Sequence, residues 1–176
     1  MRLGVKYGLL LAASVSLWTL IVHVLGIYTT RIRYAHVVDQ AALVLPIVVV
    51  TLALLAARRR RDGQLSWRHG ILTGLEVAAV ASPLTVAALW IYHHAVNPEW
   101  LSILVNYERE RLGAAGASPD AIALAVSRLQ QGGTDRAQIV SGLLGTLAMV
   151  FVLSVIITLL LKLVASFRNA PAARTV

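Results

Sequence analysis

Glu76 is the residue whose type and position point most directly to chemistry. It is the only acidic residue inside the long apolar stretches of the chain, and a carboxyl group surrounded by hydrocarbon is costly unless it has a partner or a function. One hypothesis is therefore a proton or cation relay, or a counter-ion for a charged substrate. The competing hypothesis is that Glu76 reaches back to the membrane interface and pairs with Lys162 or with an arginine.

Histidines offer a second chemistry, but their spacing builds no metal site. His93 and His94 point about 100° apart on a helix, and neither has a ligand-type partner four residues away. An outer cation site that they form with Glu99 is the alternative to ordinary histidines at the membrane interface. The chain has no cysteine, which removes thiolate metal sites. We also find no phosphate-binding glycine loop, no nucleophile constellation and no paired carboxylates. The sequence therefore predicts no catalytic residue, no metal, no cofactor and no enzymatic activity.

The composition indicates that these residues belong to a membrane protein. Of the 176 residues, 58% are hydrophobic and only 14% are charged, against roughly 25% charged in typical globular domains. A soluble domain of this size cannot hide so much apolar surface. We predict an all-α membrane protein, with residues 1–176 forming one domain. Four stretches have about the 20 residues that a helix needs to cross the hydrocarbon, namely 7–28, 40–57, 70–96 and 138–162.

The charges outside these spans differ between the two sides of the predicted membrane. Basic residues are in excess on the side that holds both termini, whereas arginines and acidic residues balance on the other side. By the positive-inside rule, both termini and the tail 163–176 are cytoplasmic. The net charge of +8 then reflects orientation and anionic lipid headgroups, not a nucleic-acid partner. The expected topology and lipid anchors are Arg58, Arg59, Arg60, Arg61 and Arg68.

Small residues recur at four-residue spacing in two of the spans. One ladder is Gly4, Gly8, Ala12 and Ser16, and the other is Gly70, Gly74, Ala78 and Ser82. In lipid, helices associate where small residues let their backbones approach closely. The leading hypothesis is therefore a non-enzymatic accessory or structural subunit that uses these faces to bind itself or a larger membrane complex. The alternative is a small transporter or channel in which Glu76 is the coupling group.

The connection between the third and fourth spans is too long for an inert turn. Asn97-Pro98 offers a helix cap followed by a first-position proline, and Ser118-Pro119 offers a second start of the same kind. We predict an amphipathic helical hairpin over 98–132 on the outer face, which either binds a partner or only covers the mouth of the bundle. Its candidate partner surface is Trp100, Leu101, Leu104, Tyr107, Ile122, Val126 and Leu129.

Several of these motifs together resemble a known family. Lys6-Tyr7-Gly8-Leu9 opens the first span, Ile91-Tyr92 precedes Asn97-Pro98-Glu99, and Ser118-Pro119-Asp120-Ala121-Ile122 follows. This layout resembles the small bacterial inner-membrane proteins catalogued as domain-of-unknown-function family 4199, over roughly residues 4–165. The resemblance implies a bacterial membrane protein with four helices, and it implies no activity, cofactor or site residue.

Overall fold

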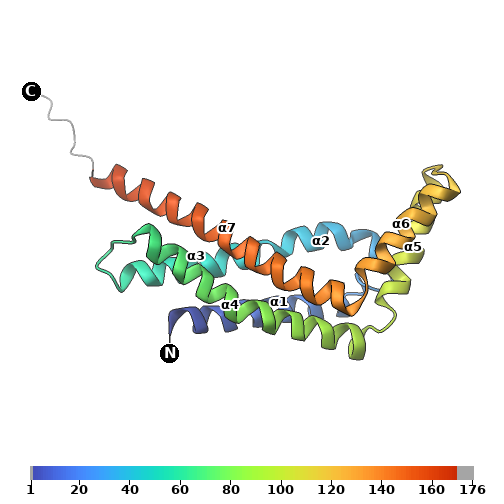
Figure 1. Ribbon diagram of the computed structural model, residues 1–176, viewed down its shortest axis with the longest axis horizontal. Coiled ribbons are helices and arrows are strands. Elements are labelled where there is room, and N and C mark those ends of the chain that lie inside the picture. The colour runs from blue at the N-terminus through green and yellow to red at the C-terminus, as the bar shows by residue number, and fades with distance from the viewer. Residues whose placement is uncertain (1, 170–176) are drawn as a thin grey trace, which may run out of the picture.

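The computed structural model describes the backbone of residues 2–169 and the side chains of residues 2–166. All regular structure in this part of the chain is helical. Four long helices form an elongated bundle, and two shorter ones, α5 and α6, lie across one end of it (Figure 1). The long helices are α1 (Leu3–Val24), α3 (Val44–Arg59), α4 (Trp67–Ile91) and α7 (Asp135–Asn169), and the shorter ones are α5 (Trp100–Ala114) and α6 (Pro119–Gly132).

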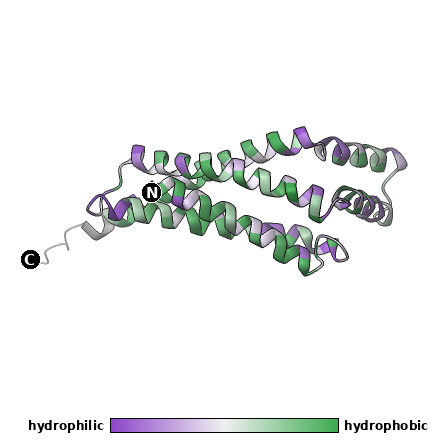
Figure 2. Cartoon of the chain, turned by 90° about the horizontal axis from the view of Figure 1, so that it is seen from below, coloured by the Kyte–Doolittle hydropathy of each residue, from purple (hydrophilic) through white to green (hydrophobic). Residues whose placement is uncertain are grey.

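The bundle has two chemically different ends. The hairpin end carries α5, α6 and the connection after α1, whereas the basic end carries the start of α1, the end of α7 and the arginine-rich connection after α3 (Figure 1). Figure 2 shows hydrophobic residues along the four long helices, with hydrophilic residues gathered at the two ends and on the hairpin. Four helical segments have the length and hydropathy of membrane spans, which confirms the predicted all-α chain with four such helices. These segments are Leu3–Val24, Ile32–Arg59, Trp67–Val96 and Asp135–Ser166.

The first two spans differ in detail from their predicted bounds. α1 ends before 28 because Gly26 has a φ of +73° and the Ile27 amide donates to the Val22 carbonyl at 3.1 Å, the geometry by which a glycine terminates a helix. The second span begins earlier, with the 3₁₀ turn η1 (Ile32–Tyr34) and α2 (Ala35–Ala42), and it is interrupted before α3. This break lies one turn before Pro46, which has no amide to bond to the preceding turn.

The last two spans are longer than predicted. α4 runs unbroken through Pro83 and continues into a π-helical turn, η2 (Tyr92–Val96). α7 begins at Asp135 and continues to Asn169, so the first part of the predicted tail 163–176 is helical. Residues 170–176 of that tail lie outside the described residues.

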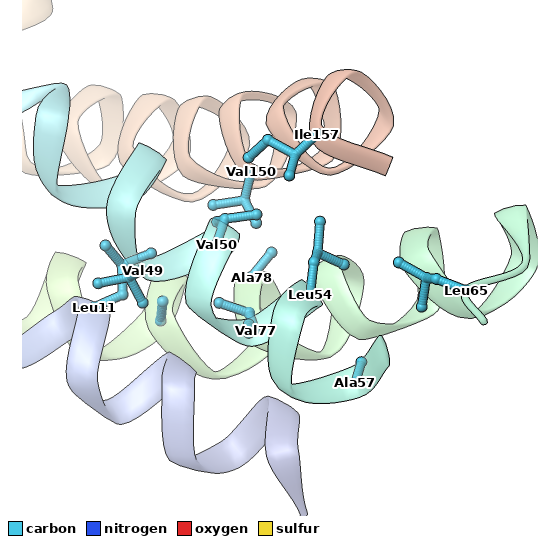
Figure 3. Close-up of a cluster of buried hydrophobic side chains, with 12 residues drawn as sticks. Leu11, Val49, Val50, Leu54, Ala57, Leu65, Val77, Ala78, Val150 and Ile157 are labelled. Carbon is cyan, nitrogen blue, oxygen red and sulfur yellow. The ribbon is translucent and has the colours of Figure 1, made fainter. Parts of the chain in front are cut away.

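α4 is the central helix of the bundle. α1 and α7 pack along two different sides of α4, and α3 contacts all three of these helices. Their inward side chains form one core cluster, in which Leu11, Val50, Leu54, Val77 and Val150 come from the four helices and point toward one another (Figure 3). The core therefore consists of the faces that the long helices turn inward.

Both small-residue ladders lie inside this bundle. A Cβ atom on Gly8 of α1 would lie 2.6 Å from the Cβ atom of Val80 on α4. A Cβ atom on Gly74 of α4 would lie 2.5 Å from the Cβ atom of Ser154 on α7. Every ladder residue except Ser16 is buried. The ladders thus make helix–helix contacts within this one chain, and neither is a free face for a second subunit.

The hairpin consists of two helices, as predicted, but only one of the two predicted N-terminal caps is correct. The Ser118 hydroxyl accepts a hydrogen bond from the Ala121 amide at 3.3 Å and caps α6, as the sequence predicts. Asn97, however, does not cap α5, which begins at Trp100 after a residue with no side-chain capping bond. The Asn97 side chain instead turns into the molecule, where it finds hydrogen-bond acceptors.

Candidate functional site

The π-turn η2 organises a buried polar cluster at the hairpin end. Such turns are rare and often mark functional positions, because they re-aim the side chains that follow. Here Tyr92 and Asn97 are buried, with 6% and 4% of their surface exposed. The side-chain amide of Asn97 donates to the Tyr92 hydroxyl at 3.2 Å and to the Tyr28 carbonyl at 3.4 Å. The turn thereby joins the end of α4 to the connection that follows α1.

Two further contacts extend this cluster to α1 and α2. His23 Nδ1 of α1 lies 3.0 Å from the Tyr92 hydroxyl. The Tyr28 hydroxyl donates to Asp39 Oδ1 of α2 at 2.5 Å. Burial and the Asp39 carboxylate together raise the pKa of Tyr28 above its ordinary value of 10.0. Tyr28 therefore remains a neutral hydrogen-bond donor at physiological pH.

A pocket of about 320 Å³ opens beside this cluster, and we call it the hairpin-end pocket. The Tyr28 and Tyr92 rings on its wall meet edge to face with centroids 6.3 Å apart, and Trp100 stacks on His93 with centroids 4.3 Å apart. Ligand pockets are typically mostly apolar, with a few fixed polar groups and a volume of about 300 Å³ or more. This pocket has that character. Its lining is Thr19, Tyr28, Ile32, Ala35, Asp39, Leu89, Tyr92, His93, Asn97, Trp100 and Leu104.

The two neighbouring histidines brace the pocket from the α7 side. His93 Nδ1 lies 2.6 Å from Gln138 Oε1, and His94 Nε2 lies 3.5 Å from Asp135 Oδ1. These contacts tie η2 to the start of α7. Among the described residues, no group of three or more His, Asp or Glu side chains lies where it could hold a metal ion. In this structure the two histidines thus link η2 to α7, and His93 also lines the pocket.

Glu76 lies far from this pocket, near the basic end. A Cβ atom on Gly4 of α1 would lie 2.7 Å from Glu76 Oε2, so the glycine leaves room for the carboxylate. Glu76 is exposed and lines a second pocket, of about 540 Å³, into which arginines also project. Lys162 lies over the Trp67 ring, 5.3 Å from its centroid. Of the two partners considered from the sequence, the structure therefore brings Glu76 toward the arginines, without forming an ion pair among the described residues.

The predicted partner surface on the hairpin is largely occupied within the chain. Val126 is buried, and the other six residues of that surface are half-buried. Trp100 and Leu104 line the hairpin-end pocket, while Leu101 packs against Gly133. The structure thus brings the base of α5 into the pocket.

The hairpin-end pocket itself was not predicted from the sequence. Tyr28 and Tyr92 follow the pattern of an aromatic belt at a membrane boundary, and Asn97 follows that of a helix cap. The contacts that unite these residues span 69 positions, so no local spacing reveals them. The one available signal was that Tyr92 and Asn97 both stand in the stretch that carries the family resemblance.

Comparison with known proteins identifies one family, whose model matches the part of the chain that contains this site. The family model described as "Protein of unknown function (DUF4199)" matches residues 6–163. This range includes every residue that lines the hairpin-end pocket. No curated protein and no solved structure matches the chain. The chain belongs to the DUF4199 family.

Proposed function

We propose that this chain is a non-enzymatic accessory protein of the bacterial inner membrane that binds a small ligand in the hairpin-end pocket. The observation that carries the proposal is the convergence of α1, α2, η2 and α5 on one pocket with buried, hydrogen-bonded polar groups. Burying polar groups is costly unless each is satisfied. A helix bundle that only filled the membrane would gain more from apolar residues at the positions of Tyr92 and Asn97.

The ligand class follows from the lining of the pocket. Four aromatic rings, those of Tyr28, Tyr92, His93 and Trp100, offer flat apolar surfaces. The Asp39 carboxylate and the Asn97 amide supply fixed polar groups. A small molecule with an apolar body and one or two hydrogen-bonding groups matches this lining.

The distribution of charge supports an orientation for the site. The arginine-rich connection after α3 lies at the basic end together with Lys6 and Lys162, and positive charge is retained on the cytoplasmic side of membranes. We therefore place the basic end and both termini in the cytoplasm. The hairpin and its pocket then lie on the outer face, within reach of molecules outside the membrane.

The packing also bears on the two functions considered from the sequence. Because the ladders pack within the chain, an accessory role in a larger complex would use another surface, and the hairpin end is the surface we propose. The transporter alternative depends on Glu76, which lies near the basic end and is the only carboxylate that lines the pocket there, whereas Asp39 and Asp135 of the other spans lie at the hairpin end. Relays normally need several such groups.

Native mass spectrometry of the protein released from membrane nanodiscs tests the proposal. We expect the wild-type protein to carry a small-molecule adduct and Ala35→Trp, which places an indole in the pocket, to lose it. Ala13→Trp is the matched control, because Ala13 is exposed on α1 and does not line the pocket. If Ala35→Trp retains the adduct, or if wild type carries none, the proposed ligand-binding function is wrong.

A further inference from the structure

The four consecutive arginines at the basic end do not occupy equivalent places. Arg58 Nε donates to the Gly63 carbonyl at 2.7 Å and so closes the turn after α3. Arg60 and Arg61 line the pocket of about 540 Å³ between α1, α3 and α4, and Arg2 joins them from the start of α1. Arg59 does not line this pocket. Three arginines from two distant parts of the chain thus line one cavity, which we call the basic-end pocket.

Among the described residues that line the basic-end pocket, positive charge exceeds negative charge. Glu76 is the only carboxylate that lines the pocket, against three guanidinium groups and His69. Within residues 2–166, none of the three arginines forms an ion pair. The planar fork of N–H donors on arginine matches the oxygens of a phosphate group. A phosphate-bearing anion therefore matches the charge of this pocket.

The remaining lining indicates that this anion carries hydrocarbon. Leu3, Ala57 and Leu72 form the apolar part of the pocket. Leu72 is 45% exposed and Leu75, one turn further along α4, is 38% exposed. Exposed apolar side chains therefore continue from the pocket along α4 into the membrane-spanning part of the bundle. Basic pockets between helices at the cytoplasmic surface are suited to anionic lipid headgroups.

We propose that the basic-end pocket binds one anionic phospholipid, with its phosphate held by Arg2, Arg60 and Arg61 and its acyl chains lying along α4. The site is separate from the hairpin-end pocket and does not depend on the function proposed for it. It also gives Glu76 a role: its carboxylate repels the phosphate and thereby limits the affinity. Glu76 is then a selectivity residue for the headgroup and takes no part in proton transfer.

The neighbouring arginines provide a matched test. Binding of phosphatidylglycerol to the detergent-purified full chain is measured by native mass spectrometry, with phosphatidylcholine as the zwitterionic reference that has no net charge. We expect Arg60→Ala and Arg61→Ala each to weaken phosphatidylglycerol binding about tenfold, as the loss of a charged hydrogen bond does. Arg59→Ala removes the same charge from the adjacent position, and we expect it to weaken binding less than twofold. All three side chains are exposed, so none of these substitutions removes a core contact.

Two further measurements distinguish a specific lipid site from the alternative explanations. Glu76→Gln is expected to tighten phosphatidylglycerol binding several-fold, because it removes a like charge and keeps an acceptor. Inorganic phosphate at millimolar concentration is expected not to displace the lipid. Equal losses for Arg59→Ala, Arg60→Ala and Arg61→Ala would overturn the proposal in favour of diffuse attraction. Displacement by inorganic phosphate would overturn the assignment to a lipid, and weaker binding by Glu76→Gln would overturn the role given to that carboxylate.

Discussion

Gly74→Ala tests how the bundle is held together. A Cβ atom at this position would lie 2.5 Å from the Cβ atom of Ser154, closer than side chains tolerate. Ser154 has little freedom to move, because it is fully buried and its hydroxyl donates to the Val150 carbonyl at 2.6 Å. Forcing a methyl group into a packed contact costs about 1–3 kcal/mol, whereas alanine gains up to about 1 kcal/mol over glycine in a helix. We expect a net loss of about 1–2 kcal/mol of unfolding free energy.

A second substitution identifies the clash as the cause. Ser154→Gly removes the atoms that the new methyl group would meet, and the carbonyl of Val150 keeps its place in the helix. We therefore expect the double variant Gly74→Ala/Ser154→Gly to lose less unfolding free energy than the sum of the losses of the two single variants. Residues in direct contact show couplings of about 0.5–3 kcal/mol. A coupling within that range, favourable in sign, is the expected result.

Reversible unfolding of the purified chain in mixed detergent micelles measures these free energies. Gly145→Ala in α7 is the control, because a Cβ atom there would meet nothing within 4 Å. It introduces the same methyl group into a membrane helix without a clash, and we expect it to leave the stability unchanged or raised. If Gly74→Ala behaves like Gly145→Ala, or if Ser154→Gly gives no rescue, the close approach of α4 and α7 described above is wrong.

The other predictions concern the hairpin end and the hairpin. Asn97→Ala should destabilise the chain by about 1–3 kcal/mol in the same unfolding assay, because it leaves buried acceptors without a donor. Asp39→Asn should bring the raised pKa of Tyr28 back toward 10.0, read by ultraviolet titration of the phenol; an unchanged Tyr28 pKa would mean that the contact is absent. Hydrogen bonding from Arg111 lowers the pKa of Glu108 below its ordinary value of 4.5. At any pH above 4.5 the pair therefore contributes its full stabilisation to α5, and this contribution is lost as the pH falls through the lowered pKa. Arg111→Gln should raise the Glu108 pKa toward 4.5 in a carboxyl NMR titration.

The spans were predictable because a membrane imposes one requirement on every segment that crosses it. Backbone polar groups must be satisfied within the helix, so length and hydropathy suffice to identify the segments. Their ends depend on local geometry, which hydropathy does not measure. Gly26 ends α1 through its positive φ, and Pro46 interrupts the second span through its missing amide. Both residues are visible in the sequence, but only the packed structure shows that each of them ends or interrupts a helix.

The partners of the ladders were not predictable for a different reason. A face of small residues indicates that another helix packs closely against it. That helix can belong to a second copy of the chain or to the same chain, and the small residues do not distinguish the two. Gly8 finds Val80, and Gly74 finds Ser154, through a topology that no spacing encodes.

The same reason explains why the candidate site was missed. Tyr28 and Tyr92 have an ordinary local explanation as aromatic residues at a membrane boundary, and Asn97 has one as a helix cap. The function we propose arises only where η2 brings Tyr92 and Asn97 against Tyr28, which lies in another part of the chain.

Cysteine labelling tests the central claim, that an open pocket lies at the hairpin end and faces outward. The chain has no cysteine, so each introduced thiol reports one position. Ala35 lines the hairpin-end pocket, and Gln64 is exposed at the basic end. With a membrane-impermeant maleimide added to intact spheroplasts, we expect Ala35→Cys to react at once and Gln64→Cys to react only after the membrane is opened. Reaction of Gln64→Cys from outside, or no reaction of Ala35→Cys on either side, would contradict the account.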